Sequence, residues 1–394
     1  MEEIVARMET QAARCNSRGA TPRGRSRPSA STTTRCTDRR RDRGSLGPGT
    51  RRLILLFGPA AAGSPGGGEI QLQETARALS AAGLEVRLLQ HGEALPRRAD
   101  CLHLFGSHAG HLPVVAAARR SGIPVALSPI AWFDLRSYWR EPGGLGRRLA
   151  RCGRFLARAA CPTLPSWRRR LYRAVDLLLP NSTAEADQLV RYFGLPRSKI
   201  HVTPNGAGER FAGADAEPFA ELVGIRGFVL YAGRIEPRKN QLNFLRAMRG
   251  SGIPIVVLGD VLHGHEQYLD KCRRAADRRV RFVPRMDHED PRLGSAYAAC
   301  GCLALASWYE TPGLVALEAG MSGTPLVLPQ RGAAREYFGH LAQYVRPDDL
   351  PGIRRAVGLA LSGGRSPALA EHVQRNFSWK AAAQATCEAY ARIV

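Results

Sequence analysis

Short apolar runs alternate with amphipathic segments along the first half of the chain. The run Leu53–Phe57 is typical of a buried strand, and the glycine-rich stretch 58–69 leads from it into a segment of helical periodicity that stops at Gly83. Strands that alternate with helices indicate a parallel, doubly wound α/β sheet. Similar apolar runs follow at 84–89, 100–105, 123–128 and 175–181.

The second half repeats this rhythm, with a helix predicted around Asn240 to Met248. We therefore predict an α/β fold of two Rossmann-like, doubly wound domains that face a cleft. In such sheets ligands bind at the carboxyl ends of the strands. The apolar runs of this half lie at 227–234, 253–260, 280–285, 302–307 and 324–329. The predicted organisation is an N-terminal domain at 51–205, a linker at 206–222, a C-terminal domain at 223–375 and a closing helix at 376–394 with its N-cap at Ser378.

Residues 1–50 are rich in Arg, Ser, Thr, Pro and Gly and poor in aromatic residues. A segment of this composition cannot bury enough apolar surface to fold, so we predict a disordered basic tail. Over the whole chain, 57 Lys and Arg stand against 34 Asp and Glu, a net charge of +23. This charge favours anionic partners, which include nucleotide phosphates, nucleic acid and an acidic membrane surface.

The sequence contains no run of about 18 uninterrupted apolar residues, the length that a transmembrane helix needs. Glu2 and Glu3 stand where a secretory signal would carry positive charge. The nine cysteines are scattered, and Cys300 and Cys302 are too close together for a zinc ribbon. We therefore expect a cytoplasmic protein with reduced thiols.

The block S-W-Y-E-T-P-G-L-V-A-L-E places two carboxylates, Glu310 and Glu318, around the predicted start of a helix. Thr311 is a suitable helix cap, and Gly313 would let a ligand approach closely. The free N–H groups and the positive dipole at a helix N-terminus attract phosphates and hydroxyl groups. The two acids are therefore either ligands for separate hydroxyl-bearing parts of one molecule or incidental surface acids.

A second block, Y-A-G-R-I-E-P-R-K-N, places Arg234 and Lys239 after a predicted strand. Two cations at this place suit a diphosphate, because fixed positive charge stabilises the negative charge that builds on a leaving diphosphate. Arg238 lies between them, and we expect it to be solvated.

Together these blocks resemble glycosyltransferase family 4, whose fold is the two-domain GT-B arrangement. The resemblance implies that Glu310 contacts the donor sugar, that Glu318 contacts the ribose hydroxyls, and that Arg234 and Lys239 clamp the diphosphate. Catalytic roles then fall to Glu310, Arg234 and Lys239. The turn G-G-G-E at 66–69 resembles the family's N-terminal glycine turn, and the closing F-S-W-K resembles its returning helix. The other donor-binding residues implied are Gly67, Gly68, Gly233, Gly313 and Leu314.

Membership of this family implies a retaining hexosyltransferase that uses a nucleotide-diphosphate sugar and needs neither a metal nor another cofactor. The expected acceptor is a glycan, as in polysaccharide biosynthesis, a lipid-linked molecule or a small molecule. Many family members have a His after the fourth strand, where this sequence has Ser128 and Pro129. His103, His108 and Asp134 are the nearby candidates for the acceptor side.

Two alternatives remain open from the sequence. One is a sugar-nucleotide epimerase on the same fold, which would need an acid–base cluster that the sequence does not display. The other is a catalytically inactive basic binding protein, although no specific nucleic-acid motif is present.

A peripheral contact with anionic membrane is a further expectation. Four arginines recur at helical spacing, with Leu145, Leu149, Cys152 and Leu156 predicted on the opposite, packed face. The arginines are Arg147, Arg151, Arg154 and Arg158.

Overall fold

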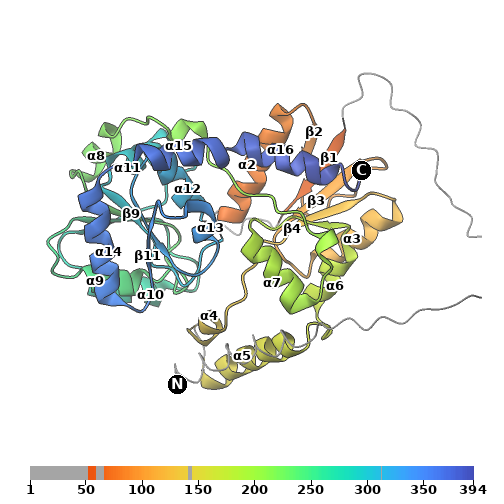
Figure 1. The fold of residues 1–394 in the computed structure, drawn as a ribbon, viewed down its shortest axis with the longest axis horizontal. Helices are drawn as coiled ribbons and strands as arrows, with labels where there is room; N and C mark the ends of the chain where they lie inside the picture. Colours follow the sequence, from red (N-terminus) through yellow and green to blue (C-terminus); the bar gives the residue numbers. More distant parts are fainter. Residues whose placement is uncertain (1–51, 59–65, 141–143, 312) are drawn as a thin grey trace, which may run out of the picture.

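The computed structural model describes residues 52–58, 66–140, 144–311 and 313–394. These residues form two α/β domains that lie side by side (Figure 1). The predicted tail at 1–50 and Pro312 lie outside the described residues.

The N-terminal domain, as far as the structure describes it, is built on a five-stranded parallel sheet in the order β2-β1-β3-β4-β5. Because β1 lies beside β3 as well as β2, the chain reverses its direction of winding at this point. This order places the switch point, where ligands bind in open α/β sheets, at the end of β1. The strands are β1 Leu53–Phe57, β2 Glu85–Leu88, β3 Cys101–Phe105, β4 Val125–Ser128 and β5 Leu177–Leu178.

Helices cover both faces of this sheet, and α5 lies away from it at the lower edge of the domain (Figure 1). The helix α2 starts directly at the glycine turn, so its N-terminus lies at the switch point. The helices are α2 Gly67–Ala81, α3 His111–Arg120, α4 Leu135–Arg140, α5 Leu145–Ala160, α6 Trp167–Ala174 and α7 Thr183–Phe193. Two short 3₁₀ turns follow, η1 Arg197–Lys199 and η2 Glu209–Phe211.

The described part of the C-terminal domain contains a six-stranded parallel sheet in the order β11-β10-β9-β6-β7-β8. Counted from β6, this is the strand order 3-2-1-4-5-6 of a dinucleotide-binding fold, read from the other edge. Its switch point lies between β6 and β9. The strands are β6 Val229–Ala232, β7 Ile255–Leu258, β8 Val280–Val283, β9 Cys302–Ala304, β10 Leu326–Pro329 and β11 Gln343–Val345.

The helices of the C-terminal half surround this sheet, and the last of them, α16, extends over the N-terminal domain (Figure 1). They are α8 Glu217–Val223, α9 Gln241–Met248, α10 Glu266–Ala275, α11 Pro291–Ala299, α12 Leu314–Met321, α13 Ala334–Phe338, α14 Leu350–Gly363, α15 Pro367–Asn376 and α16 Trp379–Tyr390. The two parallel sheets and their covering helices confirm the predicted fold of two doubly wound domains.

Among the described residues, none of the helices is both long and apolar enough to cross a bilayer.

The chain crosses between the domains at Gly206 and Ala207 and again at Phe377 and Ser378, and these two segments lie side by side. The Ala207 amide donates to the Phe377 carbonyl over 2.8 Å, and Gly206 packs directly on the backbone of Ser378, where a Cβ would overlap it. Beyond this point Tyr390 of α16 is buried against the N-terminal sheet. The two crossings therefore lie against each other.

The linker is shorter than the predicted 206–222. Helix α8 begins at Glu217, and its Phe219 and Val223 are fully buried in the core of the C-terminal domain. The sequence prediction was wrong at this boundary because the short apolar pattern of α8 resembles that of a linker with scattered hydrophobic residues.

Candidate functional site

A cavity of about 360 Å³ lies between the two domains, at the carboxyl ends of both sheets. The glycine turn before α2, together with Ile130 and Trp132, lines it from the N-terminal domain. The loops after β6, β7, β8 and β9 line it from the C-terminal domain. The nine residues that were predicted to be catalytic or to bind the donor all contribute to the lining of this cavity. They are Gly67, Gly68, Gly233, Arg234, Lys239, Glu310, Gly313, Leu314 and Glu318.

Glu310 and Lys239 form a buried ion pair in the wall of the cavity. Lys239 Nζ donates to Glu310 Oε1 over 2.6 Å, and Ser307 Oγ donates to the same oxygen over 2.6 Å. Burial alone would raise the pKa of Glu310, but the Lys239 and Arg238 cations and these hydrogen bonds hold it below its ordinary value. Glu310 is therefore an ionised carboxylate that two donors hold in one orientation.

The backbone around Glu310 is fixed by a close approach of the loop after β10. The Ala333 amide donates to the Glu310 carbonyl over 2.9 Å, and Gly332 lies against the same backbone with φ +102°. A Cβ at Gly332 would overlap the Glu310 carbonyl oxygen. Glycine is required here both for its positive φ and for the contact. Neither Gly332 nor Ser307 could be recognised from the sequence, because nothing in the local pattern marks them.

The loop that carries Lys239 is anchored on the other side by Asn240. This residue has φ +62°, and its Nδ2 donates to the carbonyls of Ala306 and Pro347 over 2.9 and 2.8 Å. An Asn tolerates this left-handed conformation better than most residues. Asn240 therefore ties the loop after β6 to the end of β9, where the segment that leads to Glu310 begins.

Arg238 differs from the prediction of a solvated cation. Its side chain lines the cavity and is 28% exposed, and it pairs with Glu236 over 2.9 Å. Its guanidinium also lies 5.3 Å from the centre of the Tyr309 ring. Sequence spacing alone could not show that the turn at Pro237 directs this side chain inward.

Helix α12 begins later than predicted. Its N-cap is Gly313, with φ +83°, and its first residue is Leu314, so Thr311 does not cap it. Glu318 is the fifth residue of the helix and is 4% exposed. Its two oxygens are held separately, Oε1 by His288 Nε2 at 2.8 Å and Oε2 by the Tyr297 hydroxyl at 2.6 Å.

Arg234 lies where the two domains meet. It lines the cavity, and a Cβ at Gly66 would come within 2.9 Å of its Nη1. The Gly66 amide donates to Glu69 Oε2 over 2.8 Å, which closes the first turn of α2. The glycine turn thus brings a helix N-terminus and a guanidinium to the same side of the cavity.

The predicted acceptor-side residues lie outside the cavity lining. His103 is 1% exposed within the N-terminal core, with Nδ1 2.8 Å from the Tyr390 hydroxyl and Nε2 2.9 Å from Ser128 Oγ. Burial lowers the pKa of His103 to about 3, so its ring is neutral. His103 therefore attaches α16 to the sheet, and the interpretation as an acceptor-side residue is replaced by a structural one. The exposed His108 is not among the lining residues either.

Asp134 also has a different environment from the one expected. Its carboxylate forms an ion pair with Arg331 of the C-terminal domain and accepts a 2.7 Å hydrogen bond from Ser137 Oγ. Asp134 is thus engaged in a contact between the domains and does not line the donor cavity. A charge pair between residues 197 positions apart leaves no trace in a single sequence.

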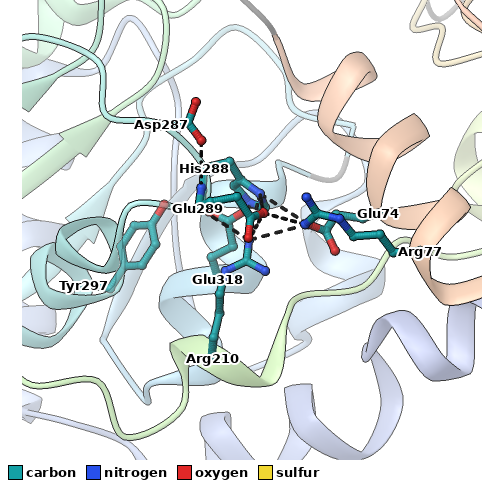
Figure 2. Close-up of polar contacts among 8 residues, drawn as sticks. All are labelled: Glu74, Arg77, Arg210, Asp287, His288, Glu289, Tyr297 and Glu318. Atoms are coloured by element: carbon teal, nitrogen blue, oxygen red, sulfur yellow. Dashed lines mark hydrogen bonds and ion pairs between the residues drawn. The ribbon is translucent and has the colours of Figure 1, made fainter. Parts of the chain in front are cut away.

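Three possible metal ligands, Glu74, His288 and Glu289, lie within reach of one another at the edge of the cavity (Figure 2). Their neighbours are cations: Arg77 Nη1 lies 3.0 Å from Glu74 and 2.5 Å from Glu289, and Arg210 Nη2 lies 3.5 Å from Glu74. These guanidinium groups already balance the carboxylates, so the cluster is better described as a salt-bridge network.

Comparison with known proteins agrees with this geometry. The family model "Glycosyl transferases group 1" matches residues 219–350, and the model "Glycosyl transferase 4-like domain" matches residues 92–206. The chain belongs to this glycosyltransferase family. The two matched segments correspond to the two domains. The match at 219–350 contains every predicted site residue of the C-terminal half.

Two curated relatives illustrate the range of this family. A D-inositol 3-phosphate glycosyltransferase from Streptomyces avermitilis is 30% identical over 247 residues, which are 56% of this chain and 53% of the relative. A glycogen synthase from Mycobacterium tuberculosis is 27% identical over 322 residues, which are 77% and 72% of the two chains. The chain thus spans about half the length of the inositol-phosphate relative.

Solved structures show the same fold. The Anabaena protein HepE in complex with UDP and glucose superposes with a TM-score of 0.66 and 16% identity, over 87% of this chain and all of that one. A Rickettsia africae glycosyltransferase gives a TM-score of 0.67 with 13% identity, over 87% and 98% of the two chains. The GT-B architecture of the family is therefore the architecture of this chain.

Proposed function

We propose that this protein is a retaining glycosyltransferase that moves a sugar from a nucleoside-diphosphate donor to a glycan, lipid-linked or small-molecule acceptor. The observation that carries the proposal is the meeting of Glu310, Glu318, Lys239, Arg234 and the glycine turn at 66–68 in one cavity. The Anabaena protein HepE, which shares this fold, forms complexes with UDP and with UDP-glucose, which supports a nucleotide-sugar donor.

In this proposal the diphosphate lies between the N-terminus of α2 and the cations of the C-terminal domain. The first N–H groups of a helix have no partner within it, and the helix dipole favours an anion there. Arg234 adds a permanent positive charge across the domain boundary. Lys239 has three N–H donors, of which Glu310 takes one, so the others can reach a phosphate oxygen.

The carboxylates would bind the neutral parts of the donor. Glu310 lies beside Lys239 and therefore suits the hydroxyl groups of the transferred sugar, whereas Glu318 lines the cavity from helix α12 and is assigned to the ribose. Both are already oriented by protein donors, so little side-chain entropy is lost when a hydroxyl group binds.

The proposed transfer occurs on one face of the sugar and needs no protein nucleophile. The bond from the anomeric carbon to the diphosphate oxygen breaks, a bond from that carbon to the acceptor oxygen forms on the same face, and the acceptor proton passes to the departing phosphate oxygen. Arg234 and Lys239 stabilise the negative charge that develops on the diphosphate. With two cations in this role, a divalent metal would have little to add.

Two aromatic residues are the best candidates for the acceptor side. Trp132 of the N-terminal domain and Tyr309 of the C-terminal domain line the cavity with their rings nearly parallel, 24° apart and 6.4 Å between centres. Such rings offer an apolar face to a sugar or an aromatic group and a polar edge to its hydroxyls. They replace His103 and Asp134 in the proposal.

The proposed membrane contact rests on helix α5, where only part of the predicted packed face is buried and only part of the basic face is exposed. Leu145 and Leu149 are exposed at 63% and 54%, whereas Cys152 is buried. Of the four arginines, Arg147 and Arg154 are exposed, and Arg151 and Arg158 are half-buried. We therefore propose that the exposed Arg147 and Arg154, which helical spacing places on one side of α5, contact anionic lipid. Leu145 and Leu149 lie on the other side of the helix.

Calorimetry with UDP, GDP and ADP tests the donor assignment. If Arg234 clamps the diphosphate, Arg234→Ala weakens binding of the preferred nucleotide by about 1.5–3 kcal/mol, as for a charged hydrogen bond. The matched control is Arg226→Ala, which removes a 62% exposed arginine that pairs with Glu217 in the same domain. Equal affinity in the two folded variants would contradict the assignment.

A further inference from the structure

His288 lines the donor cavity and also contacts the N-terminal domain. It follows β8, is 8% exposed, and was not singled out in the sequence. Its Nε2 lies 2.8 Å from Glu318 Oε1, and its Nδ1 lies 3.4 Å from Glu74 Oε1 on helix α2 of the other domain (Figure 2). One imidazole therefore separates the carboxylate assigned to the ribose from a carboxylate of the opposite domain.

Arg210, from the linker turn η2, covers the face of this imidazole. Its Nη2 lies 2.8 Å from His288 Nδ1 and 3.3 Å from His288 Nε2. An in-plane approach to the lone pair of one nitrogen would leave the other nitrogen much farther away. The guanidinium therefore lies over the ring, and both in-plane N–H positions remain available to the carboxylates.

This arrangement favours the doubly protonated ring, since only an imidazolium can donate to two carboxylates at once. Burial on its own lowers the pKa of His288, but the hydrogen bonds with Glu318 and Glu74 raise it to about 9, and Arg210 opposes them. The charged and titratable groups around the ring come from every element packed on it: Glu74 and Arg77 of α2, Arg210 of η2, Asp287 and Glu289 of its own loop, Tyr297 of α11 and Glu318 of α12.

Glu318 is consequently fixed by two donors, one on each oxygen. His288 holds Oε1, and the Tyr297 hydroxyl holds Oε2. A carboxylate has about four lone-pair sites, so two remain for ligand hydroxyl groups on the cavity side. Without His288 the carboxylate would lose the donor that opposes Tyr297 and would be free to turn.

We propose that His288 is a positioning residue that presents the Glu318 carboxylate to the two ribose hydroxyls of the donor and connects it, through Glu74, to helix α2 of the N-terminal domain. The inference rests on the proposed function, since it deepens the role of the same cavity. It assigns ribose selectivity to a residue that acts on the nucleotide through Glu318. It also makes that selectivity dependent on the contact between the domains.

The direct test compares UDP with its analogues that lack the 2′- or the 3′-hydroxyl, with GDP and ADP and their deoxy analogues in parallel. We expect the wild type to prefer the ribonucleotide by about tenfold or more, as for a hydrogen bond to a charged group. His288→Gln should reduce this preference to about twofold or less. The control, His263→Gln, changes a histidine whose side chain is fully exposed and should leave the preference unchanged.

The pH dependence provides a readout that a merely structural residue would not alter. With the pKa of His288 near 9, the ribose preference of the wild type should be constant from pH 7 to 8 and should decline as the pH rises through about 9. The ratio of the two affinities cancels ionisation of the base, which both ligands share. Glu74→Gln, which removes one of the two carboxylates, should move this decline to lower pH.

The outcomes separate the two proposals. A wild type that binds none of these nucleotides would overturn the proposed function and this inference together. A wild type that prefers the ribonucleotide, with the same preference in His288→Gln, would overturn the inference alone. Should the variant fold poorly, the wild-type profile still decides, because a ribose preference that stays constant from pH 7 to 10 would contradict the role of His288.

Discussion

Lys239 and Glu310 follow different strands, β6 and β9, and meet as a buried ion pair with 2.6 Å between Nζ and Oε1. The side chains are 13% and 5% exposed, so solvent screens their attraction only weakly. Because β6 and β9 are neighbours at the switch point of the C-terminal sheet, their loops converge on the same place. The pair therefore fixes both charged groups at the edge of the donor cavity.

Breaking this pair should affect stability and turnover differently. Lys239→Met leaves the Glu310 charge buried with less compensation, which should lower the free energy of unfolding by about 3–5 kcal/mol. The double variant Lys239→Met with Glu310→Gln removes both charges and should recover most of that stability but none of the turnover. Denaturant unfolding and the release of nucleoside diphosphate from the donor measure the two effects. Full turnover in Lys239→Met would remove Lys239 from the mechanism.

The contact between the two crossing segments should be sensitive to a single methyl group. Gly206→Ala places a Cβ against the backbone of Ser378 and should destabilise the protein by about 1–3 kcal/mol, as overpacking does. The control is Gly153→Ala within α5, where a Cβ meets no atom within 4 Å. This substitution should stabilise the protein by about 0.5–1 kcal/mol, because alanine favours the helix over glycine. Thermal unfolding of the two variants checks this, and equal melting temperatures would show that the crossing is loose.

His103 should matter for stability in acid and not for turnover. Its folded pKa of about 3 lies below the ordinary value of 6.5, so the unfolded chain binds the proton more readily. Stability should therefore fall as the pH drops below about 6.5, and His111, with a pKa lowered to about 4 by burial, acts in the same direction. His103→Gln should reduce this dependence and leave turnover near the wild-type rate. A large loss of turnover in a stable His103→Gln protein would restore His103 to the acceptor side.

The surface of α5 should bind anionic vesicles if it docks on a membrane. Changing Arg147 and Arg154 to Gln should weaken binding to such vesicles by about 2 kcal/mol, roughly 1 kcal/mol for each residue. Vesicle sedimentation measures this binding, and the difference between wild type and variant should vanish at high salt. The control changes Arg226 and Arg292, two exposed arginines of the other domain, in the same way. Equal loss in both pairs would mean that net charge, and not α5, drives the binding.

The sequence predicted best what local pattern and spacing encode. The alternating apolar runs were enough for the two doubly wound domains, and the Glu310 and Lys239 blocks each lie directly after a strand of one sheet. Because the carboxyl ends of parallel strands share one edge, residues placed after strands can be assigned to one site without coordinates.

The contacts that the sequence could not predict are long-range. His288 reaches Glu74 across the domains, Asp134 pairs with Arg331, and His103 bonds Tyr390, which is 287 residues away. A single sequence contains no signal for such pairs, since each partner alone resembles an ordinary polar residue.

The start of α5 was predicted wrongly for a different reason. Leucines at helical spacing usually mark the packed face, yet Leu145 and Leu149 are exposed near the start of α5. Cys152, predicted on the same face, is buried as expected together with Ala159, so the packed part of this face begins after the first turns of the helix.

The most direct test of the central claim is calorimetry of the preferred nucleoside diphosphate with two carboxylate variants. Glu318→Ala should weaken binding of the free nucleotide, because Glu318 is assigned to the ribose. Glu310→Ala should leave that affinity nearly intact while abolishing transfer, because Glu310 is assigned to the sugar, which the free nucleotide lacks. The reverse pattern, or a wild type that binds none of the nucleoside diphosphates, would contradict the account.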